Sequence, residues 1–281
     1  MTLHESKNAG HPDLGGLQHF GGDTGQQQAL YVQTDLGSPG DRIDRLARLA
    51  EPENWAIAGD DTAVLRAYVE WTFERLHRQR RVHTSPGGDH HVFDTGLATP
   101  QQEAIYGLFV PNRDPDGPPW QLEGWLPECA PRLHDAFPEL PGPATYTDDP
   151  GDFVYDRRCE LTVSPRQLLE VKENRAVLPG PLRSNPYQAG LVIEGAVRRA
   201  AARARRWHRT AVPCWDPARE RVNLLLPMSL TTTPDGVDVA LEVARDGAAY
   251  HGHAILGLAA AYARARQISR PGDWLGAHAQ S

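Results

Sequence analysis

The sequence predicts an α+β fold, with a mixed or antiparallel sheet flanked by helices in a single main domain. Three observations support it. Apolar residues recur at helical spacing in two early segments and again over residues 188–208. From His91 onward, short apolar runs alternate with Pro, Gly and Asp clusters, which is typical of strands and loops. Helices and strands therefore occur in separate runs, as in α+β proteins.

The helical spacing predicts four helices. The first covers Arg42–Ala50, and the second starts at a cap among Asp60, Asp61 and Thr62 and runs to about Arg80. The third covers 188–208, and the fourth, 259–268, stops before Pro271.

The apolar runs predict the strands, which are Ala104–Val110, Gln121–Leu126, Ala144–Tyr146, Phe153–Tyr155, Val222–Leu230, Val237–Ala244 and Tyr250–Leu258. Thr233-Pro234-Asp235-Gly236 predicts a hairpin turn, and Pro227 indicates an edge or a bulge. We expect six apolar residues in the core: Trp71, Phe109, Leu225, Leu241, Ile255 and Leu258.

Composition sets the domain boundaries and excludes several classes. Residues 1–40 are polar and lack apolar periodicity, so we expect a disordered tail before a domain over 41–276. The three cysteines are isolated, which argues against a disulfide framework or a cysteine zinc site. Neither a signal segment nor a membrane span is evident, so we expect a cytoplasmic protein. We predict no metal and no cofactor, and oligomeric state stays open.

Charge divides the chain into two unequal halves. Residues 1–156 carry a net charge of −14, whereas residues 157–281 carry +7. One interpretation is that the two halves attract each other within the fold. The other is that the C-terminal half binds an anionic partner.

The strongest local signal is a run of arginines. Arg199, Arg203 and Arg206 fall at i, i+4 and i+7 on the predicted helix, with Trp207 and Arg209 directly after them. Arginine binds phosphate through two hydrogen bonds, and an adjacent aromatic ring can stack on a base. Arg264 and Arg266 predict a second basic face. The alternative is a solvated helix surface that faces the acidic half.

Asp94 and Thr95 are the candidate catalytic residues. They stand before Gly96 beside an apolar strand, where a carboxylate could act as a general base. The structural alternative, which we favour, is a turn in which Asp94 bonds its own backbone and Gly96 supplies an unusual φ.

Two groups of histidines could act as metal ligands. His90 and His91 are adjacent and would point to opposite faces of an extended segment. His251 and His253 would share one face of a strand, but no third ligand is evident. Structural roles are favoured for both groups.

Several blocks in order resemble one family. They are LARLAEPENW (46–55), VLRAYVEWTFERL (64–76), FDTGL (93–97), TAVP (210–213), NLLLPMSL (223–230), YHG (250–252) and RPGDWL (270–275). Together they resemble the DUF3825 family, a domain of unknown function, over about residues 45–275. Members are associated with cold-shock and winged-helix-like RNA-binding modules, so the resemblance implies an RNA setting.

The chain departs from that family pattern in places. Asp94 replaces an asparagine, Glu170–Pro179 keeps only Asn174 and Pro179 of a polar block, and Ala259 and Ala263 replace polar residues. If those polar groups serve catalysis, this chain has lost it.

Three functions therefore compete. The leading one is binding of RNA or a nucleotide-like anion through the arginine surface. The second is an enzyme acting on a phosphorylated small molecule or RNA, with Asp94 and Thr95 near the chemistry. The third is a protein-interaction module.

Overall fold

The computed structural model describes residues 34–35, 39–56, 60–231, 236–271 and 274–275. It confirms a mixed α+β fold, but with two five-stranded sheets. The helices are α2 (Pro39–Leu49), α3 (Ala63–Arg78), α4 (Pro131–Ala136), α5 (Pro165–Glu170), α6 (Lys172–Ala176), α7 (Gly180–Arg183), α8 (Pro186–Arg206) and α9 (Leu258–Arg266), with short 3-10 helices η1 (Pro150–Phe153) and η2 (His208–Thr210).

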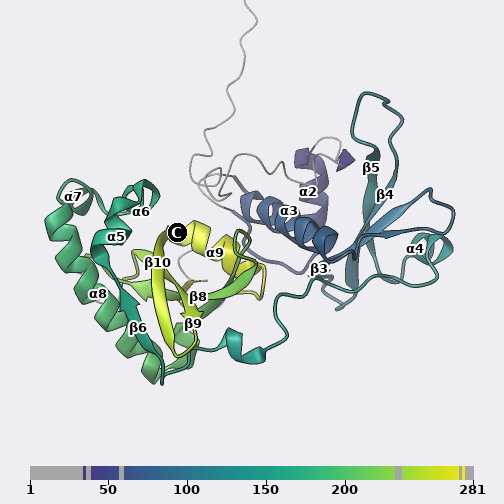
Figure 1. Cartoon of the computed structure of the whole chain (residues 1–281). Coiled ribbons are helices and arrows are strands. Elements are labelled where there is room, and N and C mark those ends of the chain that lie inside the picture. The colour runs from purple at the N-terminus through teal and green to yellow at the C-terminus, as the bar shows by residue number, and fades with distance from the viewer. Residues whose placement is uncertain (1–33, 36–38, 57–59, 232–235, 272–273, 276–281) are drawn as a thin grey trace, which may run out of the picture.

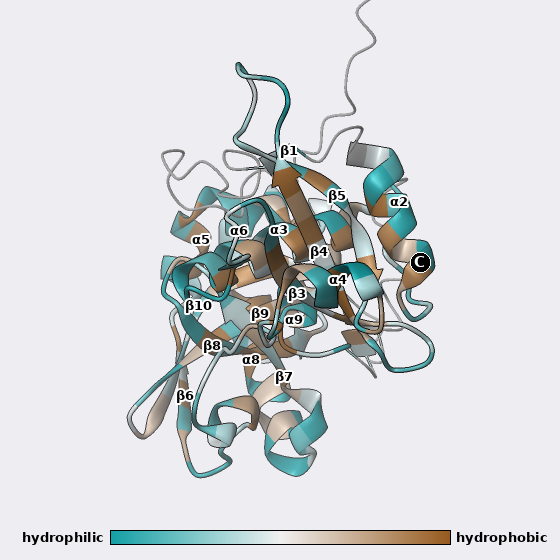
Figure 2. Ribbon diagram, turned by 90° about the vertical axis from the view of Figure 1, so that its right-hand side faces the viewer, coloured by the Kyte–Doolittle hydropathy of each residue, from teal (hydrophilic) through white to brown (hydrophobic). Residues whose placement is uncertain are grey.

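The first sheet has the order β1-β5-β4-β3-β2, from strands Thr34–Asp35, Trp120–Pro127, Ala104–Pro111, His91–Ala98 and His83–Thr84. Its pairs are antiparallel except for β1 with β5. Helices α2 and α3 pack on one face, because Ile43, Phe73 and Phe93 share a core. The short helix α4 covers the other face through Leu133. The central strands are brown, and therefore hydrophobic, in Figure 2.

The second sheet has the order β6-β10-β9-β8-β7, from strands Glu160–Val163, Ala249–Gly257, Val239–Asp246, Arg221–Met228 and Val212–Asp216. Only β6 with β10 is parallel. Helix α8 packs on one face and α9 on the other, and α9 also contacts α3. Figure 1 shows α3 and α9 between the two sheets, with α8 on the outside.

Residues of both sheets share one apolar cluster, in which Phe93 and Phe109 meet Leu225 and Ala261. Of the six predicted core residues, four are buried: Phe109, Leu225, Leu241 and Ile255. Trp71 and Leu258 are only partly buried, so the prediction was wrong for them. Both lie at the edge of the cluster rather than inside it.

Two predicted strands are absent. Residues 144–146 belong to no strand, and the Thr145 carbonyl oxygen instead accepts hydrogen bonds from the side chains of Arg75 on α3 and of Gln79 just after it. Phe153 is the last residue of the 3-10 helix η1. The N-cap of this helix is Asp149, whose side chain accepts a hydrogen bond from the Gly151 N–H. The apolar character of both segments reflects packing, not pairing.

The hairpin of β8 and β9 is confirmed, although 232–235 of its turn lie outside the described residues. Pro227 pairs with Ala240 of β9. It lies beyond the end of β7, whose first residue Val212 pairs with Leu225. Proline has no backbone N–H to donate. The strand tolerates Pro227 because at this position β8 has a partner strand on one side only, as an edge strand does.

The predicted tail mostly falls on residues 1–33, which lie outside the described residues. Within this segment, Thr34 and Asp35 form β1, which pairs in parallel with Trp120 and Gln121 of β5. Backbone pairing of this kind needs no apolar periodicity. Among the described residues, no helix has the length and apolarity to cross a membrane.

Candidate functional site

Helix α8 is long, and it presents small residues to the second sheet. Asn185 caps it, its side-chain oxygen accepting a hydrogen bond from the Gln188 N–H at 3.1 Å. Ala189, Ile193, Ala196, Ala200 and Ala204 are buried and follow the helical period. Alanine at most of these positions lets the helix lie close to β8, and it leaves the long arginine side chains on the outer side.

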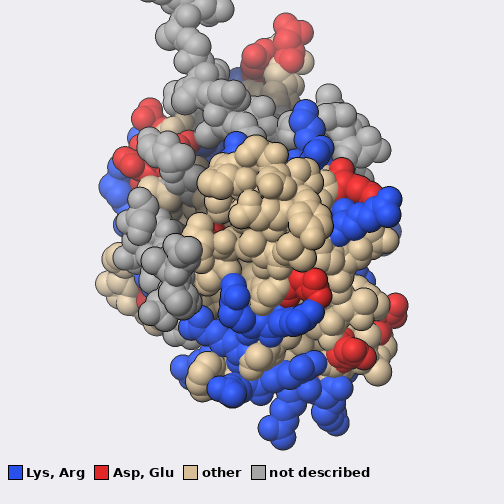
Figure 3. All heavy atoms as spheres, turned by 90° about the vertical axis from the view of Figure 1, so that its left-hand side faces the viewer, with Lys and Arg blue, Asp and Glu red and all other residues tan. Residues whose placement is uncertain are grey.

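The outer side of α8 carries the predicted arginine stripe. Arg199, Arg203 and Arg206 are all exposed, and so is Arg205. Arg209 is exposed just after the helix, and Trp207 at its C-terminal end is 58% exposed. We call Arg199, Arg203, Arg205, Arg206 and Arg209 the arginine face. Figure 3 shows Lys and Arg side chains gathered on the lower part of this side of the molecule.

The arginine face has few internal partners. Arg199 donates a hydrogen bond to the Ser229 carbonyl oxygen at 2.8 Å. Among the described residues, no carboxylate forms an ion pair with any of its five arginines. The elements that α8 mainly contacts are β8, α5, α7, η2 and β6, all within residues 157–281. The acidic N-terminal half therefore does not cover this helix in the described structure.

A groove lies beside the N-terminal half of α8. It has a volume of about 550 Å³ and apolar walls made by Pro165, Leu169, Pro186, Tyr187 and Leu191. Its charged rim includes Glu170, which pairs with Arg166 at 3.2 Å, and Glu194, which pairs with Arg198. Tyr187 is 79% exposed and Leu191 is 56% exposed. Two large apolar side chains are therefore exposed side by side in this groove.

The structure does not place Arg264 and Arg266 on a second basic face. Arg266 lies 2.7 Å from Glu53 and stacks over the rings of Trp55 and Tyr68. Arg264 lies 2.6 Å from Glu242, which is completely buried. Each arginine therefore pairs with a carboxylate whose side chain is buried against α9. The predicted second basic face at Arg264 and Arg266 is wrong.

Sequence reasoning missed a buried polar cluster between the second sheet and α9. Alternation along the strands points Cys214 and Asp216 of β7, Asn223 of β8 and Glu242 of β9 to the α9 side. A bulge in β10 between Gly252 and Ala254 brings His253 to the same side. His251 pairs with Ala244, two residues from Glu242 along β9, so strand alternation places His251 on the α9 side as well.

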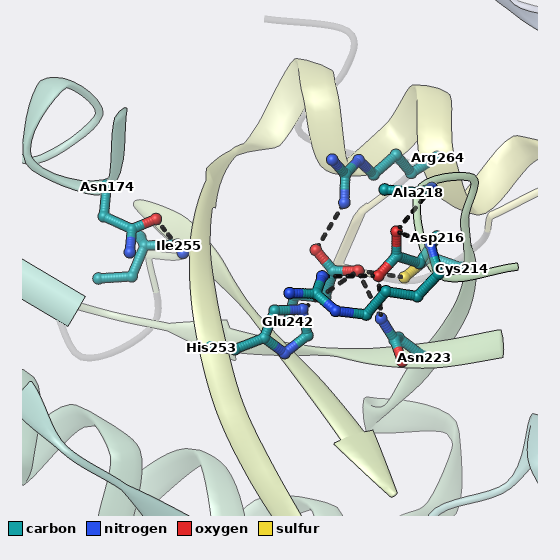
Figure 4. Close-up of polar contacts among 10 residues, drawn as sticks. Asn174, Cys214, Asp216, Ala218, Asn223, Glu242, His253, Ile255 and Arg264 are labelled. Atoms are coloured by element: carbon teal, nitrogen blue, oxygen red, sulfur yellow. Dashed lines mark hydrogen bonds and ion pairs between the residues drawn. The ribbon is translucent and has the colours of Figure 1, made fainter. Parts of the chain in front are cut away.

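Hydrogen bonds tie the cluster together, as Figure 4 shows. The Asn223 side-chain N–H donates to Glu242 at 2.8 Å and to Asp216 at 3.3 Å. Arg219 pairs with Asp216 at 3.1 Å from the solvent side. The nearest approach of His253 Nε2 to Glu242 Oε1 is 3.9 Å, which is too long for a hydrogen bond.

Ionisation in the cluster follows from these contacts. Burial raises the pKa of Asp216, but hydrogen bonds from Arg219 and the charge of Arg264 outweigh it and hold that pKa below its usual value. Burial raises the pKa of the Cys214 thiol far above its usual value. Cys214 therefore stays protonated and unreactive.

Asp216, Glu242 and His253 are also the residue types that hold divalent metals. One ligand atom from each lies within 4.8 Å of the others. However, Arg264 and Arg219 already place a cation on each carboxylate. A metal would have to displace an arginine, so the geometry favours a charge network that joins α9 to the sheet.

Asn174, which the resemblance to the family singled out in the sequence, lies on α6. Its side-chain oxygen accepts from the Ile255 N–H at 2.9 Å, and its side-chain N–H donates to the Leu168 carbonyl at 3.0 Å. It is buried and links α5 and α6 to β10. Its role in the described structure is to hold these elements together.

Asp94 and Thr95 show the hydrogen bond and the glycine φ of the structural alternative, but within strand β3, where its pairing with β4 is irregular, rather than in a turn. The Gly96 N–H donates to Asp94 at 2.8 Å, and Gly96 has a φ of +70°. A side chain there would meet the Tyr68 hydroxyl at 2.6 Å, so only glycine fits. Thr95 donates to the Ile105 carbonyl at 2.6 Å. Burial, opposed by the Gly96 bond and aided by the charge of Glu128, raises the pKa of Asp94 to about 6.

The raised pKa of Asp94 predicts how the stability of the protein depends on pH. Folded Asp94 holds its proton up to about pH 6, against 3.8 for the free carboxyl. Its contribution to stability is therefore complete below pH 3.8 and is lost as pH rises through 6. Asp94→Asn keeps an oxygen for the Gly96 N–H and removes the titration. The variant should be more stable than the parent at pH 8, by at most about 3 kcal/mol, and equal to it near pH 4.

Urea denaturation at both pH values measures this difference. A variant that is less stable than the parent at pH 8 would show that the ionised carboxylate makes a contact that the amide cannot replace.

The fold and the site define a two-sheet α+β domain with an exposed basic helix. The chain belongs to the DUF3825 family of domains of unknown function, which it matches over residues 46–274. No curated protein and no solved structure matches the chain significantly.

Proposed function

We propose that this protein binds RNA, or another phosphate-bearing anion, through the arginine face of α8. The observation that carries the proposal is that this face holds five exposed arginines without a carboxylate partner among the described residues. Guanidinium groups at helical spacing can each contact a phosphate, and Trp207 beside them offers a ring for stacking.

The two competing functions receive less support. Asp94 lies on β3 of the first sheet, whereas the arginine face lies on the outside of the second sheet (Figure 1). A phosphate held by those arginines would not reach Asp94. A protein-interaction module built on charge attraction would have α8 covered by the acidic half, and the described residues of that half do not cover it.

Neutralising the stripe should flatten the salt dependence of RNA binding. For single strands the slope of log affinity against log salt is about −0.7 for each neutralised phosphate. Changing Arg199, Arg203 and Arg206 together to glutamine should therefore reduce the slope by about 2 units, if each contacts one phosphate. Fluorescence anisotropy with a labelled single-stranded RNA, titrated at several salt concentrations, measures the slope.

The matched control changes Arg45, Arg48 and Arg113, which are exposed arginines of the other half, to glutamine. This control has the same net charge but should keep the parental slope. Melting temperature should barely change in either variant, because exposed charges contribute little to stability. If both triple variants flatten the salt slope equally, net charge rather than the arginine face drives RNA binding.

A further inference from the structure

The groove and Arg205 of the arginine face lie along one stripe of α8, whereas Arg199, Arg203 and Arg206 lie roughly a third of a turn around the helix. Tyr187, Leu191, Glu194, Arg198 and Arg205 follow the spacing i, i+4, i+7, i+11 and i+18, so they lie on one stripe of the helix. The stripe begins in the apolar groove and ends among the arginines. In Figure 3 a broad uncharged area lies directly beside the basic area. A helix of 21 residues spans roughly 30 Å, which is long enough for several nucleotides.

We infer that the groove between α5 and α8 is a base-binding pocket for single-stranded RNA whose phosphates lie on the arginine face. The inference rests on the proposed function and names its ligand. Tyr187 is exposed enough to stack on an unpaired base, and every base has a face for this contact. A duplex hides its base faces, so this contact selects single strands.

The rim of the groove selects RNA rather than DNA. Glu170 and Glu194 each bond one arginine, and a carboxylate has further lone pairs available. A ribose 2′-hydroxyl can donate to them, whereas deoxyribose has no such donor. The partner arginines Arg166 and Arg198 keep these carboxylates neutralised, so they repel the phosphate chain less.

The test compares three decamers by anisotropy at one salt concentration: oligo(U), oligo(dU) and an abasic decamer with the same number of phosphates. Stacking contributes about 1–3 kcal/mol for each base, so oligo(U) should bind roughly 5- to 150-fold more tightly than the abasic chain. Tyr187→Ala should weaken oligo(U) binding by a similar factor and leave abasic binding unchanged. Tyr187→Phe keeps the ring and should bind like the parent.

The outcomes separate the two proposals. If oligo(U) and the abasic chain bind equally and Tyr187→Ala has no effect, the groove is not a base pocket, although the arginine face still binds the backbone. That result would also be expected if the groove held a protein partner. If oligo(dU) binds as tightly as oligo(U), the choice of RNA is wrong. If none of the three decamers binds, the arginine face does not bind RNA, and that part of the proposed function fails.

A loss of RNA binding in Tyr187→Ala cannot be attributed to misfolding of the variant. Tyr187 is 79% exposed, so its truncation removes little buried surface and should not change the melting temperature. The slope of affinity against salt should also be the same in Tyr187→Ala and the parent, because the ring contacts no phosphate.

Discussion

Replacing Arg264 with methionine is expected to lower the free energy of unfolding by about 3–5 kcal/mol. Arg264 is the close cation partner of Glu242, at 2.6 Å, and Glu242 is completely buried. Methionine fills a similar volume but leaves that carboxylate without its counter-charge away from water. Chemical denaturation of the variant and the parent at neutral pH measures the loss.

Two controls identify the cause. Glu242→Gln in the same chain should recover part of the lost stability, because the uncompensated charge is gone. Arg166→Met removes an exposed ion pair with Glu170 and should cost less than about 1 kcal/mol. If Arg264→Met and Arg166→Met are equally mild, water reaches Glu242 and the cluster is not the buried network described above.

Sequence patterns predicted most of the long elements. Helices α2, α3, α8 and α9 and strands β4, β5, β8, β9 and β10 all lie close to their expected positions. Each is a segment in which one face meets the core and the period is long enough to recognise. The missed elements are mostly short, and β7 in particular contains Pro213 and a polar end at Asp216.

The arginine stripe of α8 could be predicted because its residues are close in sequence and lie on one helix. The polar cluster could not, because Asp216, Glu242 and Arg264 come from three separate elements. The alternating polar residues within apolar strands were the available signal: Asn223 and Glu242 sit at core positions of runs that otherwise read as apolar. A buried polar residue needs a partner, and several in neighbouring strands indicate a network.

Sequence context alone also misassigned Arg264 and Arg266. Arginines at the end of an alanine-rich helix normally face solvent, and their charge suits the helix dipole. Here α9 lies between two layers rather than outside them, so both arginine side chains meet carboxylates from elsewhere in the fold. The layer order, which only the structure provides, decides whether a basic helix end is a surface or a buried ion pair.

Leu225→Ala is expected to destabilise the protein by about 2–5 kcal/mol. Leu225 lies at the middle of β8, is fully buried, and points to the α9 side with Val212 and Ala240. Truncation removes its apolar contacts and leaves a cavity that rigid neighbours on both strands fill only partly. The shift of the urea midpoint, at unchanged slope, measures the effect.

The matched control is Leu191→Ala, which makes the same chemical change on an exposed side chain of α8. It should alter stability by no more than about 0.5 kcal/mol. A large loss in Leu225→Ala with none in Leu191→Ala would establish that the α9 side of the second sheet is core and that the outer side of α8 is free surface. An unchanged midpoint for Leu225→Ala would contradict the placement of β8, and with it the strand alternation that brings Asn223 and Glu242 together.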